Sequence, residues 1–227
     1  AVAGMWGMPG PGMMQPNVLV EYLGIKSPKW LEGTNIGGST FLLHVNHAYQ
    51  AIKAGLCDTV LILYGSLQKS NASRVLGDRP ALYSNQFEVV SGLPLPVGGY
   101  ALAAQRHMHT YGSSRETLAE IAVSTRAWAT MNENAAFQTP LTIEEVLASK
   151  PIANPLHRSD CCLVTDGGGA VVLTTNEKAK DLNTKPIYIR GYGESNSHSS
   201  INYMPNMDHL EIAKNSSKRA FNMADLN

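Results

Sequence analysis

The stretch that decides the fold is residues 34–65, which read TNIGGSTFLLHVNHAYQAIKAGLCDTVLILYG. Its glycine pair predicts a tight turn, and Ser39 or Thr40 is suited to cap the helix that follows. Apolar residues recur densely over residues 41–54, so we expect a helix that is buried over most of its circumference. Gly55 ends that helix, and the apolar run DTVLILYG is typical of a parallel strand covered on both faces.

Working outward, helical and strand-like segments alternate along the chain. We expect helices at residues 16–24, 100–112, 114–132, 142–149 and 208–227, and strands at residues 29–35, within 161–175 and at 186–195. Thr142 and Glu145 have the spacing of a capping box. This order indicates an α/β layered fold with a helical excursion. Because the chain stops after a helix that normally leads into another strand, it looks like a piece of a longer protein.

Composition excludes several classes of function. Lys plus Arg and Asp plus Glu both number 18, so no charge surplus favours nucleic acid or an anionic membrane. No apolar run approaches the roughly 18 residues that span a bilayer. The three cysteines include an adjacent pair, which favours a reducing cytoplasm over a disulfide framework. The cysteines and histidines are scattered, so we expect no metal site.

The turn at residues 35–40 has two interpretations. Its backbone N–H groups lie at a helix N-terminus, where the helix dipole favours an oxyanion or a phosphate oxygen. Alternatively, the glycines only let strand and helix approach closely.

Other polar clusters are equally open to two interpretations. His44 and His47 share a helix face and could form a ligand or acid–base pair, or could be hydrogen-bonded inside the fold. Asp166 and the three glycines after it could cradle a phosphate, or could form a tight turn between two buried strands. Cys161 and Cys162 are expected to be small core residues.

Several segments, taken in order, resemble the thiolase superfamily, specifically its branch of sterol-carrier-protein-X-like and lipid-transfer thiolase-like proteins. They are TNIGGSTF…AIKAGLCDTVLILYG, YALAAQRHMHTYGSSRETLAEIAVSTRAWATMNENA, LTIEEVLASKPIANPLHRSDCCLVTDGGGAVVL and AFNMADLN. The resemblance covers nearly the whole chain. It implies a thiolase-like layered fold of αβαβα type with a mainly helical loop domain inserted in its N-terminal half.

The resemblance also assigns the turn. In thiolases of this type a cysteine at the helix N-terminus attacks the acyl-CoA thioester. Here Asn35 and Ser39 match residues of that motif, and Gly38 stands at the position of the nucleophilic cysteine. Cys57 is no substitute, because it follows the helix and lies on the order of 25 Å from the turn at about 1.5 Å per residue.

A chain without that cysteine is similar to the thiolase-like aldolases. The expected function is aldolase-like cleavage or formation of a C–C bond in a 3-hydroxyacyl-CoA, with no bound cofactor and a coenzyme A thioester as substrate. We expect substrate contacts at Gly37, Gly38, Ser39, Asp166 and Gly167. Two alternatives remain: a true thiolase (acetyl-CoA acyltransferase) that uses another cysteine, and a non-catalytic acyl-CoA or lipid-binding subunit.

The resemblance further implies a division of the chain and its partners. Residues 1–65 and 160–182 would belong to the N-terminal thiolase-like half, residues 66–159 to the inserted loop domain, and residues 183–227 to the start of an incomplete C-terminal half. The family's acid–base motifs would lie beyond this chain. We expect a homodimer, with a small OB-fold and zinc-ribbon protein as a further partner.

Overall fold

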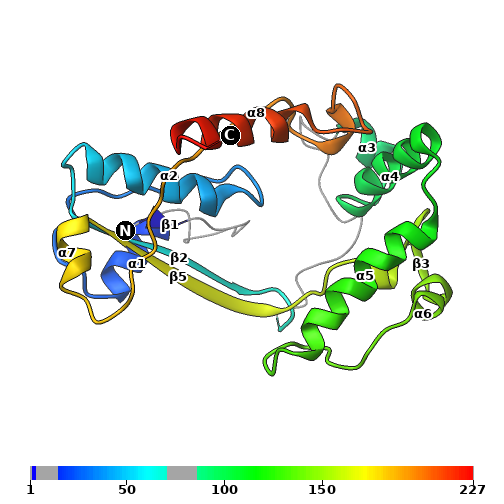
Figure 1. The fold of residues 1–227 in the computed structure, drawn as a ribbon, viewed down its shortest axis with the longest axis horizontal. Coiled ribbons are helices and arrows are strands. Elements are labelled where there is room, and N and C mark those ends of the chain that lie inside the picture. Colours follow the sequence, from blue (N-terminus) through cyan, green and yellow to red (C-terminus); the bar gives the residue numbers. More distant parts are fainter. Residues whose placement is uncertain (1, 4–14, 71–85, 227) are drawn as a thin grey trace. The chain divides into compact units, whose positions relative to one another are not determined.

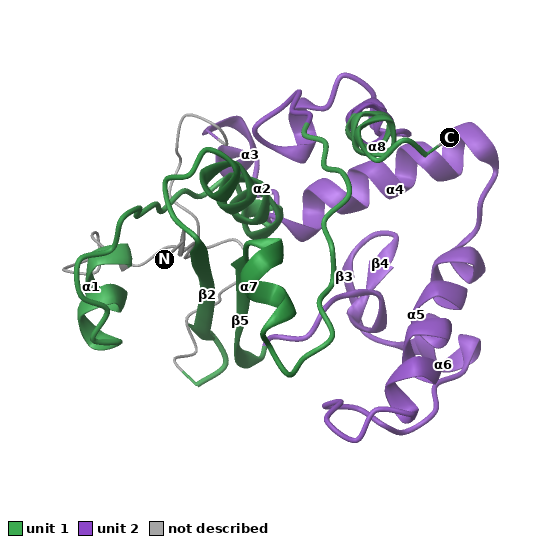
Figure 2. Ribbon diagram, turned by 60° about the vertical axis from the view of Figure 1, so that its left-hand side comes forward, with its two compact units in different colours: residues 1–71, 165–194, 216–227 green, residues 72–164, 195–215 purple. Residues whose placement is uncertain are grey.

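The computed structural model describes residues 2–3, 15–70 and 86–226. The chain divides into two compact units, which Figure 2 colours separately. Unit 1 is drawn from residues 1–71, 165–194 and 216–227, and unit 2 from residues 72–164 and 195–215. The C-terminal helix α8 (Glu211–Met223) begins in unit 2 and ends in unit 1.

Unit 1 is built on a mixed sheet. Its elements in chain order are β1 (Val2–Ala3), α1 (Gln15–Tyr22), α2 (Thr40–Lys53), β2 (Thr59–Leu67), β5 (Asp166–Thr174) and α7 (Asn176–Lys180). β1 pairs in parallel with β2, which pairs antiparallel with β5, so the strand order is β1-β2-β5. Helix α2 runs along this sheet (Figure 1).

The core of unit 1 lies between α2 and the sheet. Its buried members are Ala48, Ala51, Cys57, Val60 and Ile62. The two alanines lie three residues apart on one helix face, and their small side chains let α2 approach β2 closely. The predicted helix is therefore present, but it is not buried over most of its circumference. In the described part of the chain only one face of α2 meets the sheet, and Leu42 on another face is 76% exposed.

Two predicted strands are absent from the described residues. Residues 29–35 hold only an isolated bridge at Glu32, and the parallel partner of β2 is instead β1. Residues 186–195 are in neither helix nor strand. Side chains of α2 hold the end of this segment, because Gln50 donates a hydrogen bond to the Tyr192 hydroxyl and Asn46 donates one to the Glu194 carboxylate. None of the described strands pairs with this segment, so it forms no ladder.

β2 is also less covered than its apolar run suggests. Val60 and Ile62 are 1% and 3% exposed, and both point to the α2 side, whereas Leu61 and Leu63 between them are only half-buried. The strand is parallel to β1 as expected but antiparallel to β5.

Unit 2 is mainly helical. Its elements are α3 (Gln86–Val90), α4 (Val97–Tyr111), α5 (Arg115–Thr130), α6 (Ile143–Ala148), β3 (Pro151–Ala153) and β4 (Leu156–His157), with short 3-10 turns at Arg158–Asp160 and Ile201–Tyr203. The predicted capping box of α6 is confirmed. The Thr142 hydroxyl accepts from the Glu145 amide at 3.2 Å, and the Glu145 carboxylate accepts from the Thr142 amide at 2.8 Å.

Candidate functional site

The turn before α2 satisfies part of its backbone by itself. The Asn35 side-chain oxygen accepts from the Gly37 amide at 3.0 Å. The Thr40 hydroxyl accepts from the Ile36 amide at 2.9 Å and donates to the Gly37 carbonyl oxygen at 2.6 Å. Gly37 has φ +91°, in the left-handed region that disfavours residues with a Cβ atom. Gly37 therefore shapes the turn, and Asn35 and Thr40 brace it.

Two amides of the turn remain unused. Within the part of the chain that the structure describes, the N–H groups of Gly38 and Ser39 have no hydrogen-bond acceptor, and both residues are exposed. They lie at the start of the 14-residue helix α2, for which Ser39 is the N-cap residue but provides no side-chain cap. Unpaired amides at the positive end of a helix dipole favour a negatively charged oxygen. The turn thus offers two adjacent donors for an anion.

Gly38 leaves open space at the turn. A Cβ atom added there would have no neighbouring atom within 4 Å. Cys57 lies at the opposite end of α2 and is buried in the core beside Val60, so its sulfur is engaged in packing. The turn therefore carries no thiol of its own.

The two histidines of α2 both contact the segment that leads into the turn. His44 is fully buried, and its Nε2 atom lies 2.7 Å from the Thr34 hydroxyl. The Nδ1 atom of His47 is hydrogen-bonded to the Glu32 carboxylate. Burial lowers the pKa of His44 below its ordinary value, and the negative charge of Glu32 offsets part of this effect. These contacts favour the interpretation of a pair hydrogen-bonded inside the fold.

The turn predicted for the Asp166 glycine run is not present. Residues 166–169 form no turn, because they begin the continuous strand β5, in which Gly167 pairs with Ser66. Asp166 Oδ1 accepts from the amides of Lys69 and Ser70 at 2.9 and 3.0 Å. The hydrogen bond from the Ser70 hydroxyl contributes most to lowering the pKa of Asp166. Asp166 therefore binds the residues that follow β2, and a contact of Asp166 or Gly167 with substrate stays a prediction.

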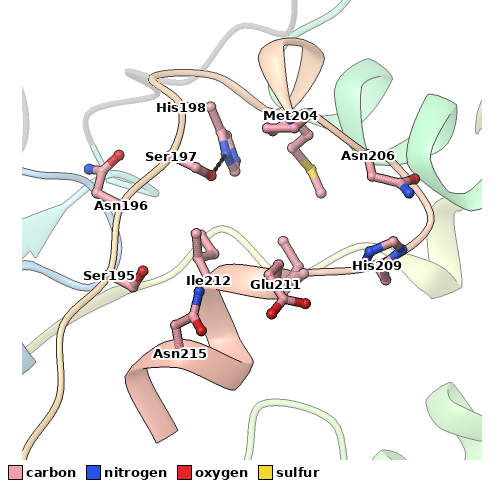
Figure 3. A pocket seen from close by; sticks show the side chains of 12 residues that line it. Ser195, Asn196, Ser197, His198, Met204, Asn206, His209, Glu211, Ile212 and Asn215 are labelled. Atoms are coloured by element: carbon pink, nitrogen blue, oxygen red, sulfur yellow. Dashed lines mark hydrogen bonds between the residues drawn. The ribbon is translucent and has the colours of Figure 1, made fainter. Parts of the chain in front are cut away.

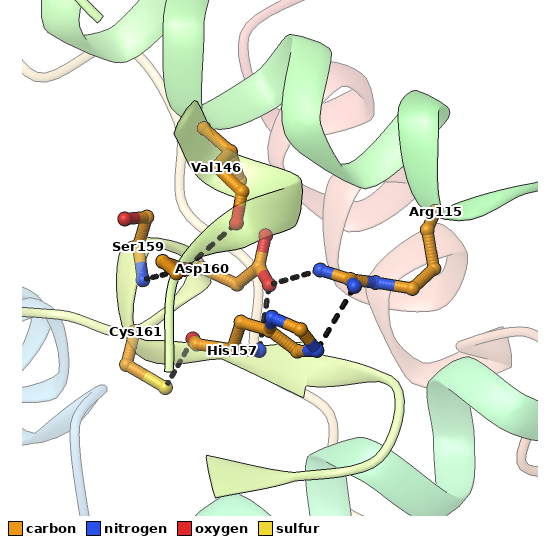
Figure 4. A network of polar contacts seen from close by, with 7 residues as sticks. Arg115, Val146, His157, Ser159, Asp160 and Cys161 are labelled. Carbon is orange, nitrogen blue, oxygen red and sulfur yellow. Dashed lines mark hydrogen bonds and ion pairs between the residues drawn. The ribbon is translucent and has the colours of Figure 1, made fainter. Parts of the chain in front are cut away.

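Unit 2 contains a polar network that sequence reasoning missed (Figure 4). Arg115 on α5 lies 2.9 Å from His157 Nε2 and 3.7 Å from the Asp160 carboxylate, which also accepts from the His157 amide at 2.7 Å. Cys161 donates to the His157 carbonyl oxygen at 3.3 Å, and burial raises the pKa of its thiol. Cys162 is exposed, so the expectation of a core residue is wrong for it. Because 42 residues separate Arg115 from His157, no local pattern signals their contact.

A cavity of about 370 Å³ is the second feature that the sequence did not indicate. Figure 3 shows its lining, which comes entirely from residues 195–215 and includes His198, Met204 and His209. His209 Nδ1 lies 2.7 Å from Asp208 Oδ1. Among the described residues no group of His, Cys, Asp or Glu is arranged to hold a metal ion. No helix in the described ranges has the length and apolar character to cross a bilayer.

Comparison with curated proteins decides the family. The chain is 30% identical over 200 residues to the 17-hydroxy-3-oxo-4-pregnene-20-carboxyl-CoA lyase of Mycobacterium tuberculosis, covering 82% of this chain and 52% of the lyase. It is 30% identical over 183 residues to the steroid side-chain-cleaving aldolase of Thermomonospora curvata, covering 77% of this chain and 47% of the aldolase. An acetyl-CoA acetyltransferase of Methanothermobacter thermautotrophicus is 27% identical over 187 residues, which cover 81% of this chain and 48% of that protein. The chain belongs to the thiolase superfamily.

Solved structures agree with this assignment at the level of fold. The Ltp2-ChsH2 aldolase superposes with a TM-score of 0.85 at 24% identity, over 100% of this chain and 59% of that one. The SCP2-thiolase-like protein type 1 of Mycobacterium smegmatis gives a TM-score of 0.71 at 20% identity, over 100% of this chain and 48% of that one. The predicted α/β thiolase-like fold is therefore confirmed. No protein-family model matches the chain.

This thiolase-like chain spans about half the length of the curated relatives that it matches. Its relatives include both thiolases, such as the acetyltransferase, and C–C lyases, such as the steroid aldolase. The predicted membership of the thiolase superfamily, close to the aldolase and sterol-carrier branch, is confirmed.

Proposed function

We propose that the complete protein is a thiolase-like aldolase that cleaves a 3-hydroxyacyl-CoA, and that the amides of Gly38 and Ser39 bind the thioester oxygen. The observation that carries this proposal is the pair of exposed N–H groups at the start of α2 that have no acceptor among the described residues, at a turn where Gly38 replaces the cysteine. Such donors stabilise negative charge that develops on a carbonyl oxygen. The 30% identity to a steroid side-chain-cleaving aldolase supports the same reaction class.

The retro-aldol reaction balances without a covalent intermediate. A base removes the proton of the 3-hydroxyl group, whose oxygen becomes the carbonyl oxygen of the leaving ketone or aldehyde. The bond between the α and β carbons breaks, and its electron pair moves into the enolate of the thioester. The amides of Gly38 and Ser39 hold the enolate oxygen until an acid protonates the α carbon. The acid and base would come from the part of the complete protein beyond this chain.

Two alternative functions are less well supported. A true thiolase needs a sulfur at the turn, and Cys57 is buried in the core away from it. A non-catalytic acyl-CoA or lipid-binding subunit would use the same amides without turnover. Incubating the full-length protein with a 3-hydroxyacyl-CoA, and assaying for a released ketone or aldehyde, separates these functions. Tight binding without release would favour the binding subunit.

One amide can be removed selectively. Ser39 has φ −82°, at the edge of the range that proline adopts, about −65 ± 15°. In the full-length protein Ser39→Pro deletes that N–H group, and we expect kcat to fall by about 10²–10³-fold, as for loss of an oxyanion donor. Ser39→Ala keeps the amide and removes only the hydroxyl, so it should keep most of the activity. Equal losses in both variants would assign the effect to the hydroxyl and contradict the proposal.

We also propose that the substrate is a coenzyme A thioester and that Gly37 contacts it beside the two amides. We also keep residues 66–159 as the inserted loop domain and the homodimer with a small OB-fold and zinc-ribbon partner. The name of one solved relative joins Ltp2 to ChsH2, and a benzoylsuccinyl-CoA thiolase relative is named as a subunit. Size-exclusion chromatography of the full-length protein with light scattering tests the dimer. A cytoplasmic location stays a prediction from the cysteines.

A further inference from the structure

We propose that His44 is a positioning residue, whose hydrogen bond to Thr34 fixes the direction in which the Gly38 and Ser39 amides point. This inference rests on the proposed function of those amides. On this proposal the buried His44 of α2 holds the anion-binding turn in place, although no step of the reaction uses its imidazole.

The contact is short and local to the turn. His44 Nε2 lies 2.7 Å from the Thr34 hydroxyl, and His44 is fully buried. Thr34 directly precedes Asn35, whose side-chain oxygen accepts from the Gly37 amide at 3.0 Å. The imidazole is therefore linked to the turn through a hydroxyl, one peptide unit and an amide side chain. A shift of Thr34 would move Asn35 and with it the start of the turn.

Two side chains of α2 hold residues 34–37 against the helix. Thr40 and His44 lie four residues apart and so share a helix face, and they are 2% and 0% exposed. Thr40 bonds the backbone at Ile36 and Gly37, while His44 bonds the side chain of Thr34. Residues 34–37 are thus fixed to α2 at several points, and they lead directly into the first amides of that helix. Fixing both sides of the turn sets the geometry of the unused N–H groups between them.

His44 acts as a neutral group in this arrangement. Its Nδ1 atom is buried and, among the described residues, has no hydrogen-bond partner. An imidazolium would place a charged N–H group there without an acceptor, which is costly. Burial lowers the pKa of His44; the nearby Glu32 opposes this effect and the nearby His47 adds to it. Because a fully buried imidazole cannot touch substrate, its function is to position and not to transfer a proton.

The pKa of a cysteine introduced at position 38 tests how the amides of the turn are oriented, and it needs no assay of enzyme activity. Gly38→Cys fits the open space at that position. A helix N-terminus stabilises a thiolate, so in the full-length protein the pKa of this thiol should lie below about 8.5, the value of a free cysteine. The rate of iodoacetamide alkylation against pH gives that pKa. Adding His44→Phe should raise it and lower the thiolate fraction at neutral pH by about two- to fivefold.

Further variants separate positioning from folding. Thr34→Val removes the same hydrogen bond from the other side and should shift the thiol pKa equally, with no further shift in the double variant. His44→Gln keeps a donor for Thr34 and should restore the low pKa. His47→Ala removes the contact with Glu32 but keeps the hydrogen bond between His44 and Thr34, so it should leave the thiol pKa unchanged.

The outcomes distinguish the two proposals. If the pKa of the Gly38→Cys thiol is that of a free cysteine, the amides do not attract an anion, and the proposed function fails together with this inference. If that pKa is low but neither His44→Phe nor Thr34→Val changes it, the anion site stands and the role of His44 is overturned. Should His44→Phe fail to fold, the Thr34→Val variant gives the same decision.

Discussion

The hydroxyl of Thr40 donates a hydrogen bond to the carbonyl oxygen of Gly37 at 2.6 Å, and so it closes the turn that opens α2. The Thr40 hydroxyl oxygen also accepts from the Ile36 amide at 2.9 Å, and Thr40 is only 2% exposed. One buried side chain therefore bonds two backbone groups of the turn. This arrangement explains how a turn with two glycines holds a single conformation.

We predict that Thr40→Val destabilises the protein by about 1–2 kcal/mol, because it removes the acceptor of the Ile36 amide and one of the two hydrogen bonds to the Gly37 carbonyl oxygen. Urea unfolding followed by circular dichroism measures the change. Thr40→Ser keeps the hydroxyl and should lose much less. A valine variant as stable as the serine variant would show that the hydroxyl does not brace the turn.

The two glycines of the turn should respond differently to alanine. Gly37 has φ +91°, so Gly37→Ala is expected to cost about 1–2 kcal/mol of unfolding free energy. Gly38 has open space and no such backbone strain, so Gly38→Ala should be close to neutral or slightly stabilising. Thermal unfolding of the pair is a matched comparison, and equal losses would contradict the assignment.

Sequence reasoning found the features that depend on neighbouring residues. The turn, α2 and the capping box of Thr142 and Glu145 are each determined by residues close together in the sequence, and the structure confirms them. The thiolase-like fold followed from resemblance, because its motifs are spread over the whole chain.

Features set by distant contacts were missed. The run that starts at Asp166 looks like a turn, yet its pairing with β2 makes it a strand, and that partner is about a hundred residues away in sequence. The segment 186–195 has strand-like composition, but its end bonds to α2 and none of the strands in the described ranges pairs with it. The link from His44 to Thr34 is also invisible in the pattern, because the helical period does not reveal what a helix face contacts.

The Arg115 network should matter for stability far more than an exposed ion pair. The Asp160 side chain is 5% exposed, so Arg115→Met would leave a buried carboxylate without its cation and should cost about 3 kcal/mol. Lys178→Met is the control, because Lys178 and Asp58 are 54% and 53% exposed and such pairs contribute about 0–1 kcal/mol. Chemical denaturation of both variants checks the difference. Similar losses would mean that the Arg115 pair is solvated.

Stability should depend on pH through His44. Its pKa in the folded protein lies below the ordinary value of 6.5, so the unfolded chain takes up this proton more readily. The contribution is fully present above pH 6.5 and is lost as the pH falls toward the lower folded pKa. His44→Gln removes this titration, so its unfolding free energy should decline less steeply than that of the wild type over the same window. Parallel profiles would show that His44 titrates normally.

The open space beside Gly38 has an evolutionary consequence. Glycine and cysteine codons are neighbours in the genetic code, and a Cβ atom at this position would have no described atom within 4 Å. A point mutation could therefore install or remove a nucleophile here while the fold persists. Lineages of such proteins could pass between sulfur-dependent and sulfur-free chemistry without an intermediate sequence that fails to fold.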